Sequence, residues 1–351
     1  MAKKKRKGHY SGIGGQAVIE GIMMKNKDKY SIAVRTPTGN IDVTLEEYDS
    51  FTPSKILLKI PFIRGIFNFI DSMILGIRTL NYSATFYEEE DKIKERGRRD
   101  KNYKGKKKEK FIDRIFGDNA DKILSGLTVL FSLAFAIVLF MLVPYFLSQL
   151  FRMVIVNNTV IAILEGVLRV LIFVLYVVII SNMNDIKRVY KYHAAEHKCI
   201  NCLESGHILN IANVRRSSRL HKRCGTSFMF FVVFVSIIVF MFIRVDDPVM
   251  RVIIRILLLP VIAGISYEII RLAGKSNNII VRILSAPGMM LQRLTTCELA
   301  GAKESIGDES SKRYDDDDII EVAISAVEAV FDWREYLINE FGYDPSDMYQ
   351  R

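Results

Sequence analysis

Residues 124–150 read LSGLTVLFSLAFAIVLFMLVPYFLSQL, and this stretch decides the class of fold. It contains no charged residue and is longer than the roughly 20 residues with which an α-helix crosses about 30 Å of hydrocarbon. Three stretches of similar length follow it, at residues 160–183, 226–243 and 249–273. The sequence therefore predicts a mainly α fold, a polytopic membrane protein with four transmembrane helices.

The predicted spans contain few charged residues. They include Glu165, Arg169, Arg251, Arg255 and Glu268. Glu165 and Arg169 are four residues apart, so we expect them to neutralise one another on one helix. We expect Arg251 and Arg255 to extend toward the outer interface. These spans show neither paired charges at mid-depth nor matched broken helices, so a transporter is a less favoured class.

The distribution of lysine and arginine predicts the orientation. Residues 92–110 contain 11 of them and residues 184–225 contain 9, whereas the loops 151–159 and 244–248 contain one each. Short loops rich in these residues stay in the cytoplasm, so both termini and the 184–225 loop are expected there. The net charge of +10 fits contact with anionic lipid head groups, and no specific nucleic-acid binding is expected.

The remaining segments follow from changes in composition. Alternating residues in YSIAVR and NIDVTL, with TPTG between them and Gly39 in the turn, predict a β-hairpin. The predicted order is a cytoplasmic portion with this hairpin (1–54), an interfacial amphipathic helix (55–80), a basic cytoplasmic linker (81–123), a first transmembrane hairpin (124–183), a cytoplasmic loop (184–225), a second transmembrane hairpin (226–273), an interfacial segment broken by Pro287 and Gly288 with an acidic linker ending in DDDD (274–318), and a C-terminal helix (319–351).

The loop at 184–225 contains the pattern H-x-x-E-H, formed by His193, Glu196 and His197. On a helix, positions i and i+4 differ by about 40° and position i+3 lies about 60° to the other side, so the three side chains share one face. Two imidazoles on that face can bind a divalent metal, zinc being expected, and Glu196 can act as general base on a metal-bound water. The alternative is a pair of satisfied histidines on a packed helix.

A catalytic zinc site usually has a third protein ligand and an open position for water. The candidates for this ligand are Glu204, His207, His221, Cys224 and Glu268, and the sequence does not choose among them. Glu268 is of interest because it lies near the cytoplasmic end of the fourth predicted span. Near the N-terminus, Glu20 is the only charge in GGQAVIEGIMM, so its carboxylate needs a partner if it is buried.

A structural zinc site is the rival interpretation, with Cys199-x-x-Cys202 paired to His221-x-x-Cys224. Cys199 lies about 200° around the helix from His197, so the cysteine pair faces away from the histidine pair. We therefore favour free buried thiols for Cys199 and Cys202, in line with their expected cytoplasmic location.

Five motifs in order resemble the YqhQ-like family of bacterial integral membrane proteins: GGQAVIEGIMM, YHAAEHK, RLHKRCGTSF, GISYEIIRLAG and LQRLTTCEL. The resemblance covers residues 14–330. This family is a domain of unknown function described as a predicted metal-dependent enzyme, so the resemblance implies the bacterial cytoplasmic membrane and a metal. The residues it carries over are His193, Glu196, His197, His221, Cys224, Glu268 and, less directly, Glu20. Cys199 stands where similar sequences often have threonine, which argues against a cysteine zinc site.

These observations predict a metal-dependent hydrolase with a cytoplasm-facing site, acting on a peptide or lipid-linked bond near the membrane surface. The alternative is a non-enzymatic membrane assembly, quality-control or scaffold factor that contains a structural metal or none.

Overall fold

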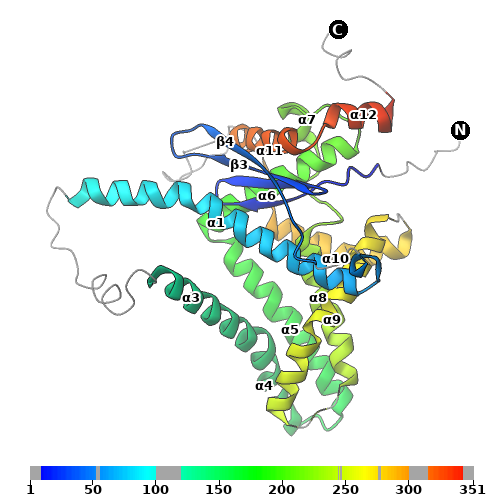
Figure 1. Ribbon diagram of the computed structural model, residues 1–351. Helices are drawn as coiled ribbons and strands as arrows, with labels where there is room; N and C mark the ends of the chain where they lie inside the picture. Colours follow the sequence, from blue (N-terminus) through cyan, green and yellow to red (C-terminus); the bar gives the residue numbers. More distant parts are fainter. Residues whose placement is uncertain are drawn as a thin grey trace, which may run out of the picture. The chain divides into compact units, whose positions relative to one another are not determined.

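Figure 1 shows the computed structural model of the chain, which describes residues 9–52, 56–99, 120–243, 245, 247–275, 278–299 and 315–342. The chain forms two units. The first contains residues 1–88, 177–232 and 260–351, and the second contains residues 89–176 and 233–259.

Among the described residues, four helical stretches are long and apolar enough to cross a membrane, as predicted: Gly126–Met153, Asn158–Ser181, Gly225–Phe242 and Val249–Leu272. The first is composed of α3 (Ala120–Ile137), a π-helical segment η3 (Val138–Leu142), α4 (Val143–Leu150) and a 3-10 turn η4 (Phe151–Met153). The other three lie in α5 (Asn158–Ser181), α8 (Gly225–Phe242) and α9 (Pro248–Lys275).

The second unit contains a buried charge cluster that differs from the sequence prediction. Glu165 Oε1 lies 2.9 Å from Arg169 Nη2 and 2.6 Å from Arg255 Nη1, and all three residues are at most 7% exposed. Arg255 therefore pairs inside the helical unit instead of extending to the outer interface. Arg169 lies midway along α5, so this span does have a paired charge at mid-depth.

A proline explains a further contact of this cluster. Pro144 has no N–H to donate to the carbonyl of Phe140, its usual helical acceptor four residues back. The π-helical segment η3 lies at this point, and Arg169 Nε donates to the Phe140 carbonyl at 3.1 Å.

The first unit contains a four-stranded antiparallel sheet in the order β1 (Gly14–Val18), β2 (Gly21–Asn26), β3 (Lys29–Arg35), β4 (Ile41–Glu47). The predicted hairpin is β3–β4, and Gly39 has the expected positive φ of 95°. The hairpin β1–β2 was not predicted. Its turn places Glu20 at a φ of 50°.

Helices cover both faces of this sheet. One face packs against α6 (Asn184–Glu204) and α11 (Asp316–Val330), which share one apolar core with β2 and β3. The other face packs against α1 (Ile63–Arg99) through Leu75, Tyr82 and Phe86. This arrangement places α6, which contains the H-x-x-E-H pattern, directly on β1 and β2.

The N-terminal boundaries differ from the prediction. A 3-10 turn η1 (Leu57–Lys59) precedes α1, and α1 continues past residue 80 to Arg99 without a break, because residues beyond 80 still pack on the sheet. The basic stretch predicted as a linker is therefore helical up to Arg99, and its residues 100–119 lie outside the described residues.

The C-terminal boundaries differ too. Helix α10 (Ile279–Thr295) includes Pro287 and Gly288, which were expected to break it, and Gly288 packs closely on Ser227 of α8. Asp315 caps α11 by accepting the N–H groups of Asp317 and Asp318, so DDDD begins a helix instead of ending a linker. The rest of the acidic segment, residues 300–314, lies outside the described residues.

The predicted C-terminal helix is two helices. α11 ends at Val330, and α12 (Trp333–Phe341) begins after Asp332, whose side chain accepts the N–H of Glu335 and caps it. A short helix α7 (Ile211–Arg216) follows α6.

Candidate metal centre

Helix α6 presents the two faces that its periodicity predicts. Cys199 and Cys202 are fully buried in the apolar core between α6, α11 and the sheet. Burial raises the pKa of both thiols, that of Cys202 to about 11, and Cys202 Sγ donates to the carbonyl of Ile208 at 3.5 Å. Among the described residues these cysteines join no cluster of possible metal ligands. The histidines lie on the other face.

Two backbone carbonyls orient the histidine rings. His193 Nδ1 lies 2.9 Å from the carbonyl oxygen of Thr295, and His197 Nδ1 lies 2.6 Å from that of Arg219. A carbonyl oxygen only accepts hydrogen bonds, so each Nδ1 carries a proton and Nε2 is the nitrogen left to act as a metal ligand. Metal-bound histidines usually have their second nitrogen held in this way.

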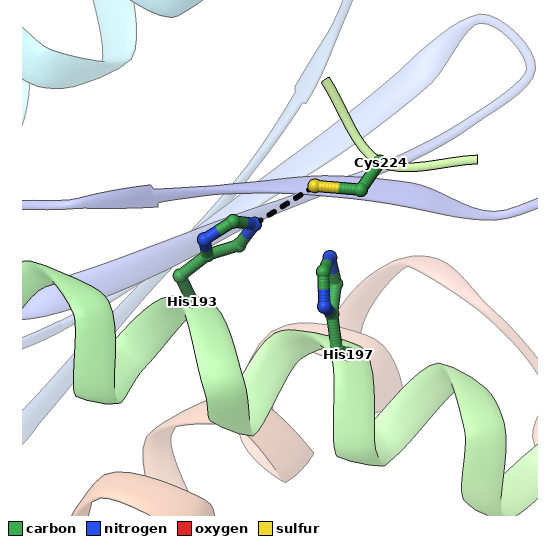
Figure 2. Close-up of side chains that lie close together, drawn as sticks. All are labelled: His193, His197 and Cys224. Atoms are coloured by element: carbon green, nitrogen blue, oxygen red, sulfur yellow. Dashed lines mark hydrogen bonds between the residues drawn. The ribbon is translucent and has the colours of Figure 1, made fainter. Parts of the chain in front are cut away.

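Cys224 completes a cluster of three donors, shown in Figure 2. One ring nitrogen of each histidine and the Sγ of Cys224 lie within 4.8 Å of one another, and His193 Nε2 is 3.2 Å from Sγ. Cys224 directly precedes α8, where Sγ also accepts the N–H of Thr226 at 3.4 Å. A backbone N–H at the start of a helix stabilises negative charge on a sulfur ligand.

The carboxylate of Glu196 lies beside this cluster. Its Oε2 is 3.9 Å from His193 Nε2 and 3.8 Å from His197 Nε2, and the residue is 4% exposed. Burial raises the pKa of Glu196 to about 7, while the neighbouring His193 ring, when it is protonated, and a hydrogen bond from the Gly15 N–H act in the opposite direction. The group can therefore exchange a proton near neutral pH.

Gly15 of β1 covers Glu196, a role that the sequence prediction missed. A Cβ at this position would lie 2.7 Å from Glu196 Cγ, 2.8 Å from Met24 Sδ and 2.9 Å from the Met23 carbonyl oxygen. Only glycine allows the strand to approach this closely and to donate its N–H to the carboxylate. The paired glycines that begin GGQAV were the available indication.

The other four candidate ligands lie elsewhere. Glu204 accepts hydrogen bonds from the Ser11 backbone and side chain and pairs with Arg223. Burial alone would raise the pKa of Glu204, but the hydrogen bond with His221 and the charge of Arg223 hold it below its ordinary value. This carboxylate is therefore an ion-pair partner.

His221 lies next to the cluster without joining it. Its ring centroid is 5.6 Å from that of His197, and its Nε2 is 3.8 Å from Glu204. Burial lowers the pKa of His221, which favours the neutral ring. His207 is exposed, and Glu268 is bound by both Arg64 Nε at 2.6 Å and Arg64 Nη2 at 2.5 Å.

The segment LQRLTTCEL supports the site, although no role was predicted for its residues. Gln292 is fully buried, accepts the backbone N–H of His221 at 2.9 Å and donates to its carbonyl at 2.7 Å. Arg219 Nη1 donates to the carbonyl of Thr296 at 3.0 Å. These bonds fix the loop before α8 against the end of α10, where the Thr295 carbonyl holds His193.

Glu20 is buried and has the partners that the sequence required. Its Oε2 accepts hydrogen bonds from Arg188 at 2.5 Å and from the Tyr192 hydroxyl at 3.3 Å, both on α6. Glu20 therefore fastens the β1–β2 turn to the helix that carries the histidines.

Comparisons with known proteins agree with the resemblance seen in the motifs. The family model described as "Protein of unknown function (DUF1385)" matches residues 60–333. The chain belongs to this family. It is 35% identical over 297 residues to the "Uncharacterized protein YqhQ" of Bacillus subtilis (strain 168), which covers 81% of this chain and 86% of that protein. No solved structure matches the chain. His193, Glu196, His197 and Cys224 lie within the family match, whereas Gly15 and Glu20 precede it.

Proposed function

We propose that this protein is a metal-dependent hydrolase of the bacterial cytoplasmic membrane. His193, His197 and Cys224 would bind one divalent ion, and Glu196 would serve as general base. The observation that carries the proposal is the convergence of three donors within 4.8 Å beside a buried carboxylate. Two neutral imidazoles and one thiolate suit zinc, which binds such donors at about 2.0–2.3 Å.

Each group at the site would have a separate role in hydrolysis. The Thr295 and Arg219 carbonyls hold both Nε2 atoms toward Cys224, and the Gly15 N–H holds the carboxylate of Glu196. A bound zinc ion would supply Lewis acidity to a water molecule. Glu196 would take the proton of that water and transfer it to the leaving group.

The position of Cys224 supports a substrate near the membrane. Cys224 precedes Gly225, the first residue of α8, which is apolar and long enough to span. The basic residues of the 184–225 loop favour the cytoplasmic side for this end of α8. We therefore propose a peptide or lipid-linked bond at the cytoplasmic membrane surface as the substrate.

A structural metal is the second candidate, because the site is well buried. Glu196, His197 and Cys224 are 4%, 1% and 6% exposed. A metal enclosed by four protein groups would rigidify the junction of α6, α8 and α10, which suits a non-enzymatic assembly or quality-control factor.

Metal content tests the ligand set. The protein is purified in detergent, and bound metal is measured by mass spectrometry for the wild type and for His193→Ala, His197→Ala, Cys224→Ser and Glu196→Gln. The matched control is Cys199→Ser/Cys202→Ser, which changes two cysteines on the opposite face of α6. We expect zinc in the wild type, Glu196→Gln and the control, and its loss in the other three variants. Metal kept without the histidines, or lost only in the control, would overturn the proposal.

Cobalt substitution separates the catalytic from the structural role. A thiolate ligand gives Co²⁺ a sulfur-to-metal charge-transfer band, which should disappear in Cys224→Ser. An open coordination position binds a hydroxamate and shifts the cobalt spectrum, whereas a closed structural site does not respond. A spectrum unchanged by hydroxamate would favour the structural role.

A further inference from the structure

The first turns of α1 pack directly on α9, with two glycines at the crossing. A Cβ on Gly65 would lie 2.9 Å from both the Cα and the carbonyl oxygen of Gly264, and a Cβ on Gly264 would lie 2.6 Å from the carbonyl oxygen of Phe62. Gly264 belongs to the stretch Val249–Leu272 and lies about 12 Å along the helix from its end. The start of α1 is therefore level with the interior of a candidate span.

Polar side chains also join these two helices, with partners on α9 that lie about one turn beyond Gly264. Arg64 binds Glu268 through two nitrogens, and Asn68 Nδ2 donates to the Tyr267 hydroxyl at 3.2 Å. A carboxylate within a membrane span needs a cationic or hydrogen-bonding partner, and α1 supplies that of Glu268. This pair explains why Glu268 is absent from the metal centre.

Beyond residue 70, α1 packs on the sheet, as Figure 1 shows. Asp71 accepts the Tyr48 hydroxyl at 3.1 Å, the Gln16 side chain lies against Gly76, and the Ser83 hydroxyl accepts the N–H of Ile19 at 3.1 Å. A small open sheet with charged residues on its edge strand stays out of hydrocarbon. Helix α1 therefore does not cross the membrane.

The face of α1 that points away from the sheet carries an apolar stripe. Its residues are Met73, Ile74, Ile77 and Leu80, which are 50%, 42%, 57% and 42% exposed. Their spacing places them on one side of the helix, opposite the buried Leu75 and Thr79. The exposed residues that follow, Asn81 and Thr85, are polar, so the stripe ends at Leu80.

We propose that residues 60–80 form a fifth membrane element, which enters one leaflet without crossing it. The leaflet is the one in which α8 begins and α9 ends, and lipid acyl chains cover the apolar stripe. Lipid is the occupant because the stripe continues from the Gly65–Gly264 contact with a candidate span. The sheet then lies on the aqueous side of α1 and the acyl chains on the other, as in a helix lying in a membrane interface.

This placement links the bilayer to β1. Gln16 lies against Gly76 of α1, and its neighbour Gly15 donates its N–H to Glu196. Lipid that supports α1 therefore also supports the strand that covers the candidate site. The membrane element itself does not depend on whether the site binds a metal.

Environment-sensitive labels test the proposal in the full-length protein. Ile77→Cys and Thr85→Cys are made in a Cys297→Ser background, since the other three native cysteines are buried. Each variant is labelled with NBD and reconstituted into phosphatidylethanolamine and phosphatidylglycerol vesicles with or without doxyl-labelled lipid. The two positions are exposed on the same helix, on either side of the end of the stripe, and the labelled background protein measures residual reaction with buried thiols.

The label at position 77 should show a blue-shifted emission that doxyl lipid quenches, whereas the label at 85 should report water and remain unquenched. Two water-like labels would overturn the proposal. A blue-shifted but unquenched label at 77 would mean that protein covers the stripe, and this too would overturn it. Quenching at both positions would overturn the boundary at Leu80. Circular dichroism and size-exclusion profiles confirm that each labelled variant is folded.

Discussion

Each of the two units buries a cluster of ionisable side chains, and the clusters differ in what their polar atoms contact. In the second unit, Glu165 is shared by Arg169 and Arg255, so its carboxylate is occupied by permanent cations. In the first unit, His193, His197, Cys224 and Glu196 lie close together. Among the described residues, no arginine or lysine lies within salt-bridge distance of Glu196.

Pairing of the buried carboxylate with arginine separates a structural charge cluster from a candidate binding site. Arginine stays charged at every physiological pH, so the first type of cluster is complete as it stands. Two imidazoles and a thiol make only weak contacts with one another. A bound metal ion would replace these contacts with coordinate bonds. Burial alone does not distinguish the two types, because both are nearly inaccessible.

Removing the shared carboxylate should have the largest effect. Glu165→Leu leaves Arg169 and Arg255 buried without a counter-charge, and breaking one side of such a pair destabilises by about 3–5 kcal/mol. Unfolding in mixed micelles measures this loss. Glu165→Leu/Arg169→Met/Arg255→Leu removes all three charges and should recover most of the stability. A triple variant as unstable as the single one would show that the cluster is not a closed ion-pair system.

Removing the charge of Glu196 should have the opposite effect and stabilise the metal-free protein at high pH. The pKa of Glu196 is raised from its ordinary 4.5 to about 7, so between these values the unfolded chain loses its proton first. The free energy of unfolding of metal-free protein then falls by about 1.4 kcal/mol per pH unit, about 3 kcal/mol in all, as pH rises through this range.

Glu196→Gln has no buried carboxyl group to lose a proton, so its free energy of unfolding does not fall in this way. The metal-free variant should be more stable than the wild type at pH 8 and nearly equal to it at pH 4. Denaturant unfolding of chelator-treated protein at the two pH values measures the difference. A variant less stable at pH 8 would contradict the prediction that burial of the charged form is the dominant effect.

Gly15→Ala should have an intermediate effect. The added methyl group meets Glu196, Met24 and the Met23 carbonyl at under 3.0 Å, and such overpacking destabilises by about 1–3 kcal/mol. Gly14→Ala is the matched control, because nothing lies within 4 Å of its Cβ position. Thermal unfolding and metal content are measured for both variants. Equal effects of the two substitutions would contradict the close approach of β1 to the site.

Ser236→Ala should have the smallest effect. Its hydroxyl lies 3.3 Å from Arg169 Nη1, at the periphery of the charge cluster. Side-chain hydrogen bonds between membrane helices contribute about 0.6 kcal/mol on average. The same mixed-micelle assay measures the change in the free energy of unfolding. A loss of stability as large as that of Glu165→Leu would place Ser236 at the centre of the cluster.

Features set by local composition were predictable from the sequence. The four candidate spans follow from the scarcity of charged residues, and the two faces of α6 follow from helical periodicity. The cap at Asp315 was within reach, since an acidic residue three positions later is a capping pattern, but the run of four aspartates suggested a solvated linker instead.

Features set by distant contacts were not predictable. Cys224 lies 27 residues after His197, and the chain between them forms the end of α6, then α7 and two turns, so spacing could not favour it over four other candidates. Glu204 and Glu268 were equally plausible ligands until Arg223 and Arg64 were found to bind them. The closeness of Gly15 to Glu196 joins residues 181 positions apart, for which one sequence contains no pairing information.

The groups that aim the two histidine rings belong to the main chain at Thr295 and Arg219. Every residue type has a peptide carbonyl, so these two acceptors survive any substitution that preserves the backbone. A saturation mutagenesis scan scored by metal retention would therefore attribute the geometry to His193 and His197 and miss the acceptors themselves. Insertions or deletions near residues 219 and 295 change the course of the backbone. These changes would reveal the role of the two carbonyls through a loss of metal retention.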